Sequence, residues 1–559
     1  MKNFYLILFS AFLVFSPKLF SSYRDTGFIT WSQPDGTEFI ARSWGDEFFY
    51  WMETNDGYRI IETSDGWYYY ATLDTYGEFT STSSRVGIDP PLPGSYQLER
   101  SAERIAEIEA LREEIALERL QESLCPGLIG PFPRNFKLGV VLIDFNPNRR
   151  YEDNHGDGYK KYFFDDMIFS EDWYTQYHPE RPWQIIGPHP ELKEVFGSLR
   201  DYYYDMTRGN IILVGRDNEP KIVNPPNPQN PDEPDWLELP KSISYYEELG
   251  TVEFLDTLYK HAVLEFGEAE MNSYEVVCFL YGGATRTSGN FRPKTRNAMY
   301  VMGKQDYNNF SHIGVHAHEF GHAAFCAHDE YDGIYDPHNW DLMAYGSDNG
   351  PDMHGACPAP LSPPYRIHYD WVQPIVVTPN VYNQIIEYNE EYPNLYKIEI
   401  RNSEEYFVLE RRVPVRFDQY TPKDGAQGSQ GILIWHAGDY RDIHDFVQLE
   451  RADNSSGLSL SDYMGDRFPY PAGTIQNFND VETPSSNTRD GDYSSISVDN
   501  IEFFEGESGF AEVDILDLAP RTPVNFHITG GIGENPTLHW NANLEVDLDG
   551  YNITTVRLF

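Results

Sequence analysis

The sequence predicts a multidomain α+β protein: a small β region and one helix, then an α/β domain, then β-sandwich domains. Three observations support this. Asp-Gly dipeptides separate short aromatic and β-branched runs near the amino terminus. Strand and helix patterns alternate in the middle of the chain, and strand-like runs follow Pro374 with little helical periodicity. The 559 residues are enough for several domains.

The first residues have the layout of a secretory signal peptide. Lys2 precedes the apolar run FYLILFSAFLVF, and serines follow at 21 and 22. The run is about a dozen residues, short of the roughly 20 that cross a bilayer. We therefore expect residues 1–22 to be removed, the protein to be secreted, and no segment to span a membrane.

The charge balance excludes one class of partner. The chain has 42 Lys and Arg against 88 Asp and Glu, a net charge of -46. Such a chain repels phosphate backbones, so we expect no nucleic-acid partner. Some carboxylate clusters, including Glu330 with Asp332 and the loop at 153–157, are candidates for Ca²⁺ in addition to solvation. The oligomeric state stays open.

Residues 23–130 combine β hairpins with a helix. Asp35-Gly36, Asp56-Gly57 and Asp65-Gly66 predict hairpin turns. Apolar residues at helical spacing predict an amphipathic helix over 101–124. Proline and glycine after Cys125 prevent its continuation, which makes this region a natural place for a processing cut.

Residues 131–375 are predicted to form the main α/β domain. KLGVVLIDF at 137–145 is a buried strand that opens it, and NIILVG and EVVCFLYGG are later strands. Helices are expected near 194–206 and 245–267. Residues 376–518 predict a β-sandwich, and 519–559 begin a second sandwich-like module that is too short to close.

The chemistry is concentrated in HAHEFGHAAFCAHDEYD, residues 316–332. His318, Glu319 and His322 form HExxH, which on a helix places both imidazoles on one face. Zinc held by such a pair lowers the pKa of its bound water toward about 7, and the glutamate can accept the proton as that water attacks a carbonyl. The motif predicts metal-assisted peptide hydrolysis, with a third ligand still to be found.

His328 has the spacing of that third ligand, HExxHxxxxxH, and WDLMAYG follows at a distance suited to a methionine turn. If the helix continued, His328 would lie roughly 80° off the ligand face, so the helix must break. Asp329 is the substitute ligand. His312 and His316 are also four residues apart, but no glutamate follows either, and we assign them either to structure or to support of the metal ligands.

HEFGH, HDEYD and WDLMAYG together resemble the metzincin zinc peptidases, most closely the secreted M6 family typified by immune inhibitor A. The looser likeness of WSQPDGTEF, LSPPYRIHYDWVQP and GILIWHAGDY to flanking segments extends it over most of residues 27–515. The resemblance implies a zincin-like catalytic domain at 131–375 and a pro-region at 23–130. It also implies a fibronectin type III-like module at 519–559.

The same resemblance implies the site. His318, His322 and His328 would bind zinc, although many M6 members have an aspartate at the third position. Glu319 would be general base and then acid, Met343 would support the metal from below, and Tyr345 would stabilise the oxyanion. The family's glycine between the second and third ligands is replaced by Phe325 here. A phenylalanine takes positive φ only with strain, so this turn is either strained or built differently.

Four cysteines in an exported chain allow three disulfide connectivities. Cys125 could occupy the open zinc position and keep the enzyme latent, or it could form a disulfide. Cys326 with Cys357 is the first expected pair. The leading hypothesis is a secreted zinc endopeptidase that is made as a latent precursor and cleaves extracellular protein. The alternative is an inactive metzincin-like protein that binds a surface or carbohydrate.

Overall fold

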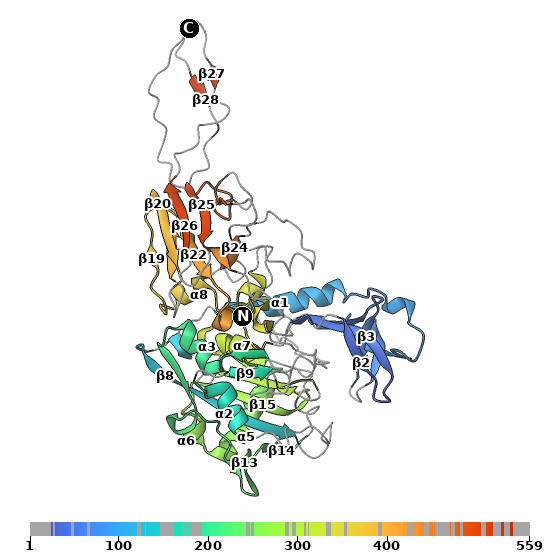
Figure 1. Cartoon of the computed structure of the whole chain (residues 1–559). Coiled ribbons are helices and arrows are strands. Elements are labelled where there is room, and N and C mark those ends of the chain that lie inside the picture. Colours follow the sequence, from blue (N-terminus) through green and yellow to red (C-terminus); the bar gives the residue numbers. More distant parts are fainter. Residues whose placement is uncertain are drawn as a thin grey trace, which may run out of the picture. The chain divides into compact units, whose positions relative to one another are not determined.

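The structure is a computed structural model of the whole chain (Figure 1). It describes residues 24–517, apart from gaps at 26–27, 46–49, 64–66, 120–124, 129, 146–160, 172–173, 178–192, 242–245, 247–250, 285–289, 293–297, 307–308, 311, 331–336, 351–354, 389–393, 422–429, 441–445, 451, 453–469, 471–475, 481–484 and 505–509, together with 527–529, 537–539 and 541. The predicted signal peptide, the loop at 153–157 and Asp332 lie outside the described residues. Among the described helices none is long and apolar enough to cross a membrane.

The chain divides into two compact units. One comprises residues 1–194, 198–201 and 211–327, and the other comprises 195–197, 202–210 and 328–559. The secondary structure is mixed, with more strands than helices among the described residues, as the α+β prediction requires. The four domain boundaries inferred from sequence remain predictions.

The first unit begins with the predicted β region. A sheet runs in the order β1-β3-β4-β5-β6-β7, with β2 also paired to β3. Gly36 and Gly57 take φ of 85° and 84° in the β2–β3 and β4–β5 turns, which confirms the first two Asp-Gly hairpins. The third, at 65–66, lies outside the described residues. The strands are β1 (Arg24–Asp25), β2 (Ile29–Ser32), β3 (Glu38–Gly45), β4 (Tyr50–Thr54), β5 (Arg59–Glu62), β6 (Tyr68–Leu73) and β7 (Phe79–Arg85).

The predicted amphipathic helix is α1 (Ala102–Arg119), preceded by the 3-10 turn η1 (Pro93–Ser95). Ser101 begins it, since its hydroxyl accepts the Arg104 N–H at 3.1 Å. A short turn, η3 (Pro126–Leu128), then leads to the central sheet.

The central sheet is built around β8 (Arg134–Phe145), the buried strand expected at 137–145. Its order is β11-β8-β15-β17-β16, with β14 added beside β8 and β18 beside β17. β8 pairs in parallel with β11, β14 and β15, β15 also pairs in parallel with β17, and β16 and β18 run antiparallel to β17. The strands are β11 (Ile211–Val214), β14 (Leu237–Leu239), β15 (Val276–Ala284), β16 (Asn290–Arg292), β17 (Ala298–Asp306) and β18 (Asn309–Phe310).

Strand alternation gives this sheet two buried faces. Val141, Ile143 and Phe145 share a hydrophobic core with residues of helix α5 (Thr251–Phe266) and of α6 (Glu268–Met271). The intervening residues face the opposite side, where the ring of Phe136 lies 5.2 Å from that of Phe320 on helix α7 (Ile313–Phe325). The sheet therefore lies between α5 and α7.

The helix expected near 194–206 starts later than predicted. Residues 193–196 form strand β10, and α3 covers only Leu199–Met206. Gly197, with φ of 112°, separates the two, because a positive φ ends the strand at a position where other residues are strained. The remaining elements of this part are α2 (Lys161–Phe169), β9 (Tyr174–Tyr177), η4 (Arg216–Asn218), β12 (Pro226–Asn227) and β13 (Asn230–Pro234).

The second unit contains two sheets that share one hydrophobic core. One runs β19-β21-β22-β23-β24 and the other β20-β26-β25. Core residues come from both, for example Leu409 and Ile434 from the first and Val498 and Val513 from the second. Two sheets facing a common core are a β-sandwich, as predicted after Pro374. The strands are β19 (Ile375–Val376), β20 (Val381–Glu387), β21 (Leu395–Glu399), β22 (Tyr406–Arg412), β23 (Gly431–Ala437), β24 (Val447–Glu450), β25 (Ile496–Phe504) and β26 (Phe510–Asp517).

Before this sandwich the second unit has short helical elements: η5 (His338–Trp340), η6 (Tyr345–Asp348) and α8 (Pro363–His368), with η7 (Arg416–Asp418) following β22. Of the predicted last module, the structure describes one antiparallel pair, β27 (His527–Thr529) with β28 (Thr537–His539). Its assignment as fibronectin type III-like stays untested.

Candidate metal centre

Helix α7 carries HExxH, and all of its residues from Ile313 to Phe325 are buried. His316 and Phe320, four residues apart, lie on the sheet side. The His316 ring lies 6.1 Å from that of Tyr300 on β17, and its Nδ1 lies 4.0 Å from the Cys278 sulfur on β15. His318 and His322 therefore share the face turned away from the sheet.

His316 is placed as a structural residue. Burial lowers the pKa of its imidazole to about 3, with a smaller effect of His312, so the ring is neutral near pH 7. His312 is the residue immediately before α7, and its side chain makes no capping hydrogen bond there.

The His318 and His322 side chains face one another. Their Nε2 atoms are 3.0 Å apart and their rings are perpendicular, with centroids 4.6 Å apart. His322 Nδ1 lies 2.6 Å from the carbonyl oxygen of Ala327. A ring nitrogen at that distance from a carbonyl is the protonated one, which leaves the lone pair of His322 on Nε2, directed at His318.

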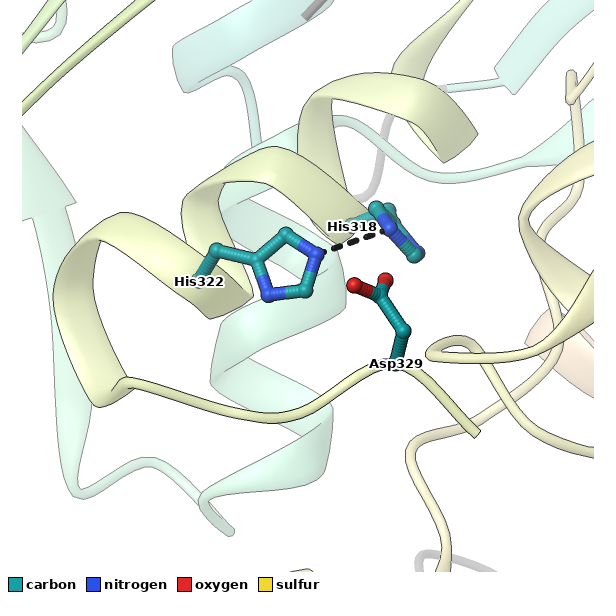
Figure 2. A group of neighbouring side chains, drawn as sticks. All are labelled: His318, His322 and Asp329. Atoms are coloured by element: carbon teal, nitrogen blue, oxygen red, sulfur yellow. Dashed lines mark hydrogen bonds between the residues drawn. The ribbon is translucent and has the colours of Figure 1, made fainter. Parts of the chain in front are cut away.

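Asp329 completes a group of three. One donor atom each from His318, His322 and Asp329 lie within 4.8 Å of one another, and Figure 2 shows the carboxylate turned toward the two rings. Both histidines are at most 1 % exposed. Two ligands about 2.05 Å from a tetrahedral zinc are about 3.3 Å apart, close to the observed separation of the two nitrogens. Two imidazoles and one carboxylate thus fit Zn²⁺ in chemistry, and the two nitrogens also fit it in spacing.

The preference for His328 as third ligand has to be corrected. The structure groups Asp329 with the two histidines and leaves His328 out. The His328 ring instead stacks on Tyr440, with centroids 4.8 Å apart and planes at 27°. In an extended chain, neighbouring side chains point in opposite directions. Of His328 and Asp329, therefore, only one can face the two histidines.

The turn between the helix and Asp329 is built differently from the glycine turn of the metzincins. Phe325 stays helical, and the left-handed residue is Cys326, with φ of 57° and ψ of 29°. The Cys326 N–H donates to the His322 carbonyl at 3.0 Å, and the Ala327 N–H to that of Gly321 at 3.3 Å. Of the two alternatives for this turn, the structure has the second: Phe325 is helical, and the left-handed residue is the next one, Cys326.

Cys326 is also covalently fixed. It forms a disulfide with Cys125, with Cα atoms 5.8 Å apart. The predicted latency thiol at Cys125 is therefore wrong, because its sulfur is already bonded, and so is the pairing of Cys326 with Cys357. Cys357 and Cys278 are buried free thiols, and burial raises the pKa of each above the usual range.

The segment after Cys125 packs tightly against the end of α7. A Cβ atom at Gly127 would lie 2.2 Å from the Phe325 ring and 2.7 Å from the Ala324 carbonyl oxygen. Only glycine fits this close approach. The disulfide and Gly127 together fix the last turn of α7, on which the orientation of the following loop depends.

Met343 lies beside the Asp329 loop. The side chain is fully buried, and its carbonyl accepts the Glu330 N–H at 2.9 Å. Tyr345, two residues on, is partly exposed and stacks on His338 with ring centroids 5.0 Å apart. The support role of Met343 and the oxyanion role of Tyr345 both remain predictions.

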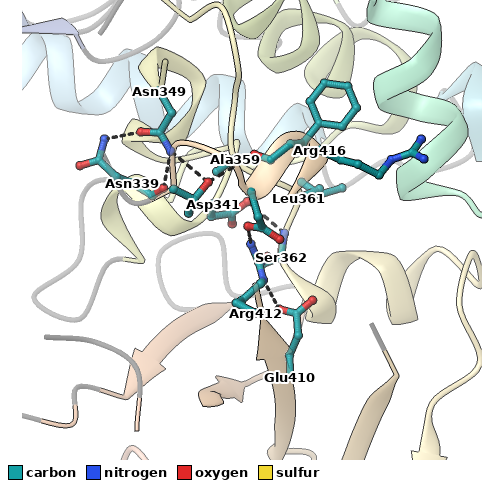
Figure 3. Close-up of polar contacts among 12 residues, drawn as sticks. Asn339, Asp341, Asn349, Ala359, Leu361, Ser362, Glu410, Arg412 and Arg416 are labelled. Atoms are coloured by element: carbon teal, nitrogen blue, oxygen red, sulfur yellow. Dashed lines mark hydrogen bonds and ion pairs between the residues drawn. The ribbon is translucent and has the colours of Figure 1, made fainter. Parts of the chain in front are cut away.

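Buried polar contacts hold residues 339–349, here called the Met343 segment; Figure 3 labels Asn339, Asp341 and Asn349 of this segment. Asp341 Oδ1 accepts the Ser362 N–H at 3.1 Å and the Met343 N–H at 3.3 Å, and burial raises the pKa of Asp341 to about 6. Asn339 and Asn349 bond reciprocally, at 2.9 and 2.8 Å. These contacts hold the segment without relying on regular secondary structure.

The sequence did not single out Tyr365 or the Ala327 carbonyl. Tyr365 lies in LSPPYRIHYDWVQP, which was noted only for its likeness to a family segment, and a backbone carbonyl has no sequence signal.

The Ca²⁺ hypothesis also stays untested. The Glu330 carboxylate accepts a hydrogen bond from the Tyr365 hydroxyl at 2.6 Å.

No protein-family model matches this chain, and no curated protein matches its sequence. The assignment therefore depends on the residues and their geometry.

Proposed function

We propose that this chain is a zinc-dependent endopeptidase of the metzincin type, secreted as a latent precursor and acting on extracellular proteins. The observation that carries the proposal is the His318, His322 and Asp329 group, with Glu319 next to His318 on the same buried helix. Two imidazoles, one carboxylate and an adjacent glutamate are the parts that metal-assisted hydrolysis of a peptide requires.

Zinc held by these three side chains would polarise the scissile carbonyl. It would also lower the pKa of a bound water molecule, so that this water could lose a proton and attack the carbonyl carbon. Glu319 would accept the proton of the attacking water and deliver it to the leaving amine. Its carboxylate is fully buried on the same helix as the two histidines. The hydrogen bond from His322 Nδ1 to Ala327 holds that imidazole in the tautomer that presents Nε2.

The test is cleavage of casein by the zinc-loaded protein, trimmed before Cys125 to release the latent form, and by a Glu319→Gln variant trimmed in the same way and with the same zinc content. We expect the variant to lose about 10²- to 10⁴-fold in kcat, the usual contribution of a general acid–base. Glu268→Gln is the control, because Glu268 is exposed at the start of α6 and should be dispensable.

Equal cleavage by wild type and Glu319→Gln would contradict the assigned base. If the trimmed, zinc-loaded wild type cleaves none of several proteins, the peptidase proposal fails, and the inactive binding protein becomes the better hypothesis.

A further inference from the structure

We propose that Tyr365 is a positioning residue for Asp329, holding the loop so that this carboxylate, and not His328, faces the two histidines. The inference rests on the proposed zinc site, although not on peptidase activity. Tyr365 lies on α8, 36 residues after Asp329 in the chain, and its side chain is fully buried.

The Tyr365 hydroxyl bonds to both neighbours of Asp329. It accepts the His328 N–H at 2.9 Å and donates to Glu330 Oε1 at 2.6 Å. The His328 carbonyl oxygen is 3.3 Å away, a longer second acceptor. One oxygen atom thus fixes the backbone before Asp329 and the side chain after it.

Two further contacts complete the restraint. The Glu330 N–H donates to the Met343 carbonyl at 2.9 Å, and the His328 ring stacks on Tyr440. With His328 and Glu330 both held on the side of Tyr365, alternation along a non-helical chain turns Asp329 the other way. Figure 2 shows the Asp329 carboxylate directed at His318 and His322.

Tyr365 itself has little freedom to move. Its ring lies 5.0 Å from that of Phe446 and 5.6 Å from that of Tyr369. Removal of the hydroxyl alone leaves this packing in place, so a Tyr365→Phe substitution separates the positioning role from a packing role.

The experiment measures the zinc dissociation constant of the full chain by competition with a chromophoric chelator. Four proteins form a double-mutant cycle: wild type, Tyr365→Phe, Asp329→Ala and the double variant. We expect Tyr365→Phe to weaken zinc binding by about 10- to 100-fold, the usual effect of losing a partner that orients a ligand. In the Asp329→Ala background the same substitution should have almost no effect, since no carboxylate remains to be oriented.

Tyr369→Phe is the matched control. Tyr369 is buried at 4 % exposure beside Tyr365, and its substitution should leave zinc affinity unchanged. Circular dichroism of the apo proteins checks that each variant folds.

The inference is overturned if Tyr365→Phe binds zinc as tightly as wild type, or if its effect is the same with and without Asp329. Zinc binding without casein cleavage by wild type trimmed before Cys125 would defeat the peptidase proposal alone. Absence of zinc binding by wild type would overturn both.

Discussion

At the residue scale, HExxH was readable because its chemistry depends on side chains four positions apart on one helix, where geometry follows from the sequence. The third ligand could not be predicted in this way, because it lies beyond the end of the helix. His328 has the family spacing, but the sequence cannot say which of two adjacent residues a non-helical chain turns inward. That choice depends on Tyr365 and Met343, which are 37 and 15 positions from His328 in the sequence.

His436 on β23 predicts a pH dependence of stability. Its Nε2 lies 2.7 Å from Glu405 Oε2 and its Nδ1 3.0 Å from Glu450 Oε1. Burial alone would lower the pKa of His436, but the two carboxylates outweigh it and raise that pKa; the Arg489 guanidinium, which donates to the His436 carbonyl, opposes them. The positively charged imidazole thus contributes its full stabilisation below about pH 6.5, the pKa in the unfolded chain. This contribution is lost as the pH rises through the raised pKa of the folded state.

We therefore expect His436→Gln to cost about 1.5–3 kcal/mol at pH 6, and less at pH 9. Thermal unfolding of both proteins at the two pH values measures this difference. Phe407→Leu, a neutral change beside the His436 ring, is the control whose cost should not vary with pH. If the difference in stability between wild type and His436→Gln is equal at both pH values, His436 does not carry the proposed positive charge at pH 6.

At the element scale, α7 and the segment 125–128 behave as one structural piece. The helix was predictable from the motif and its apolar neighbours, whereas the disulfide was not, since four cysteines allow three pairings. The residues joined are 201 positions apart. The sequence analysis expected Cys357 as the partner of Cys326, whereas the disulfide joins Cys326 to Cys125.

Gly127→Ala tests this packing directly. The added methyl group would overlap the Phe325 ring and a carbonyl of α7. We expect a loss of about 1–3 kcal/mol in the free energy of unfolding, typical of overpacking. Chemical denaturation is the measurement, and Gly94→Ala, where a Cβ meets nothing within 4 Å, is the control. Equal costs at the two glycines would contradict the tight contact.

At the scale of the whole molecule, the order of the parts could be predicted: a β region with hairpins, α1, the sheet around β8, and a sandwich after Pro374. These follow from turn dipeptides and hydrophobic periodicity, which are local. The sheet order and the buried contacts that fix the Met343 segment join residues far apart in the sequence, and no local pattern encodes them.

The Cys125–Cys326 disulfide determines which cuts would release the residues before Cys125 from the rest of a latent precursor. A cut on the carboxyl side of Cys125 leaves the preceding residues attached to Cys326, while a cut before Cys125 frees them. We expect trimming before Cys125 to release the first fragment and raise casein cleavage. Trimming near residue 130 should yield two pieces that separate on a gel only after reduction. Separation of those pieces without reductant would contradict the Cys125–Cys326 bond.

The identity of the third ligand is tested by the zinc affinities of Asp329→Ala, His328→Ala and wild type, measured by equilibrium competition with a chelator. Asp329→Ala should lose more than the about 10- to 100-fold that removal of an orienting partner costs. His328→Ala keeps the backbone N–H that Tyr365 accepts and should lose much less. If His328→Ala abolishes zinc binding while Asp329→Ala retains it, His328 and not Asp329 is the third ligand.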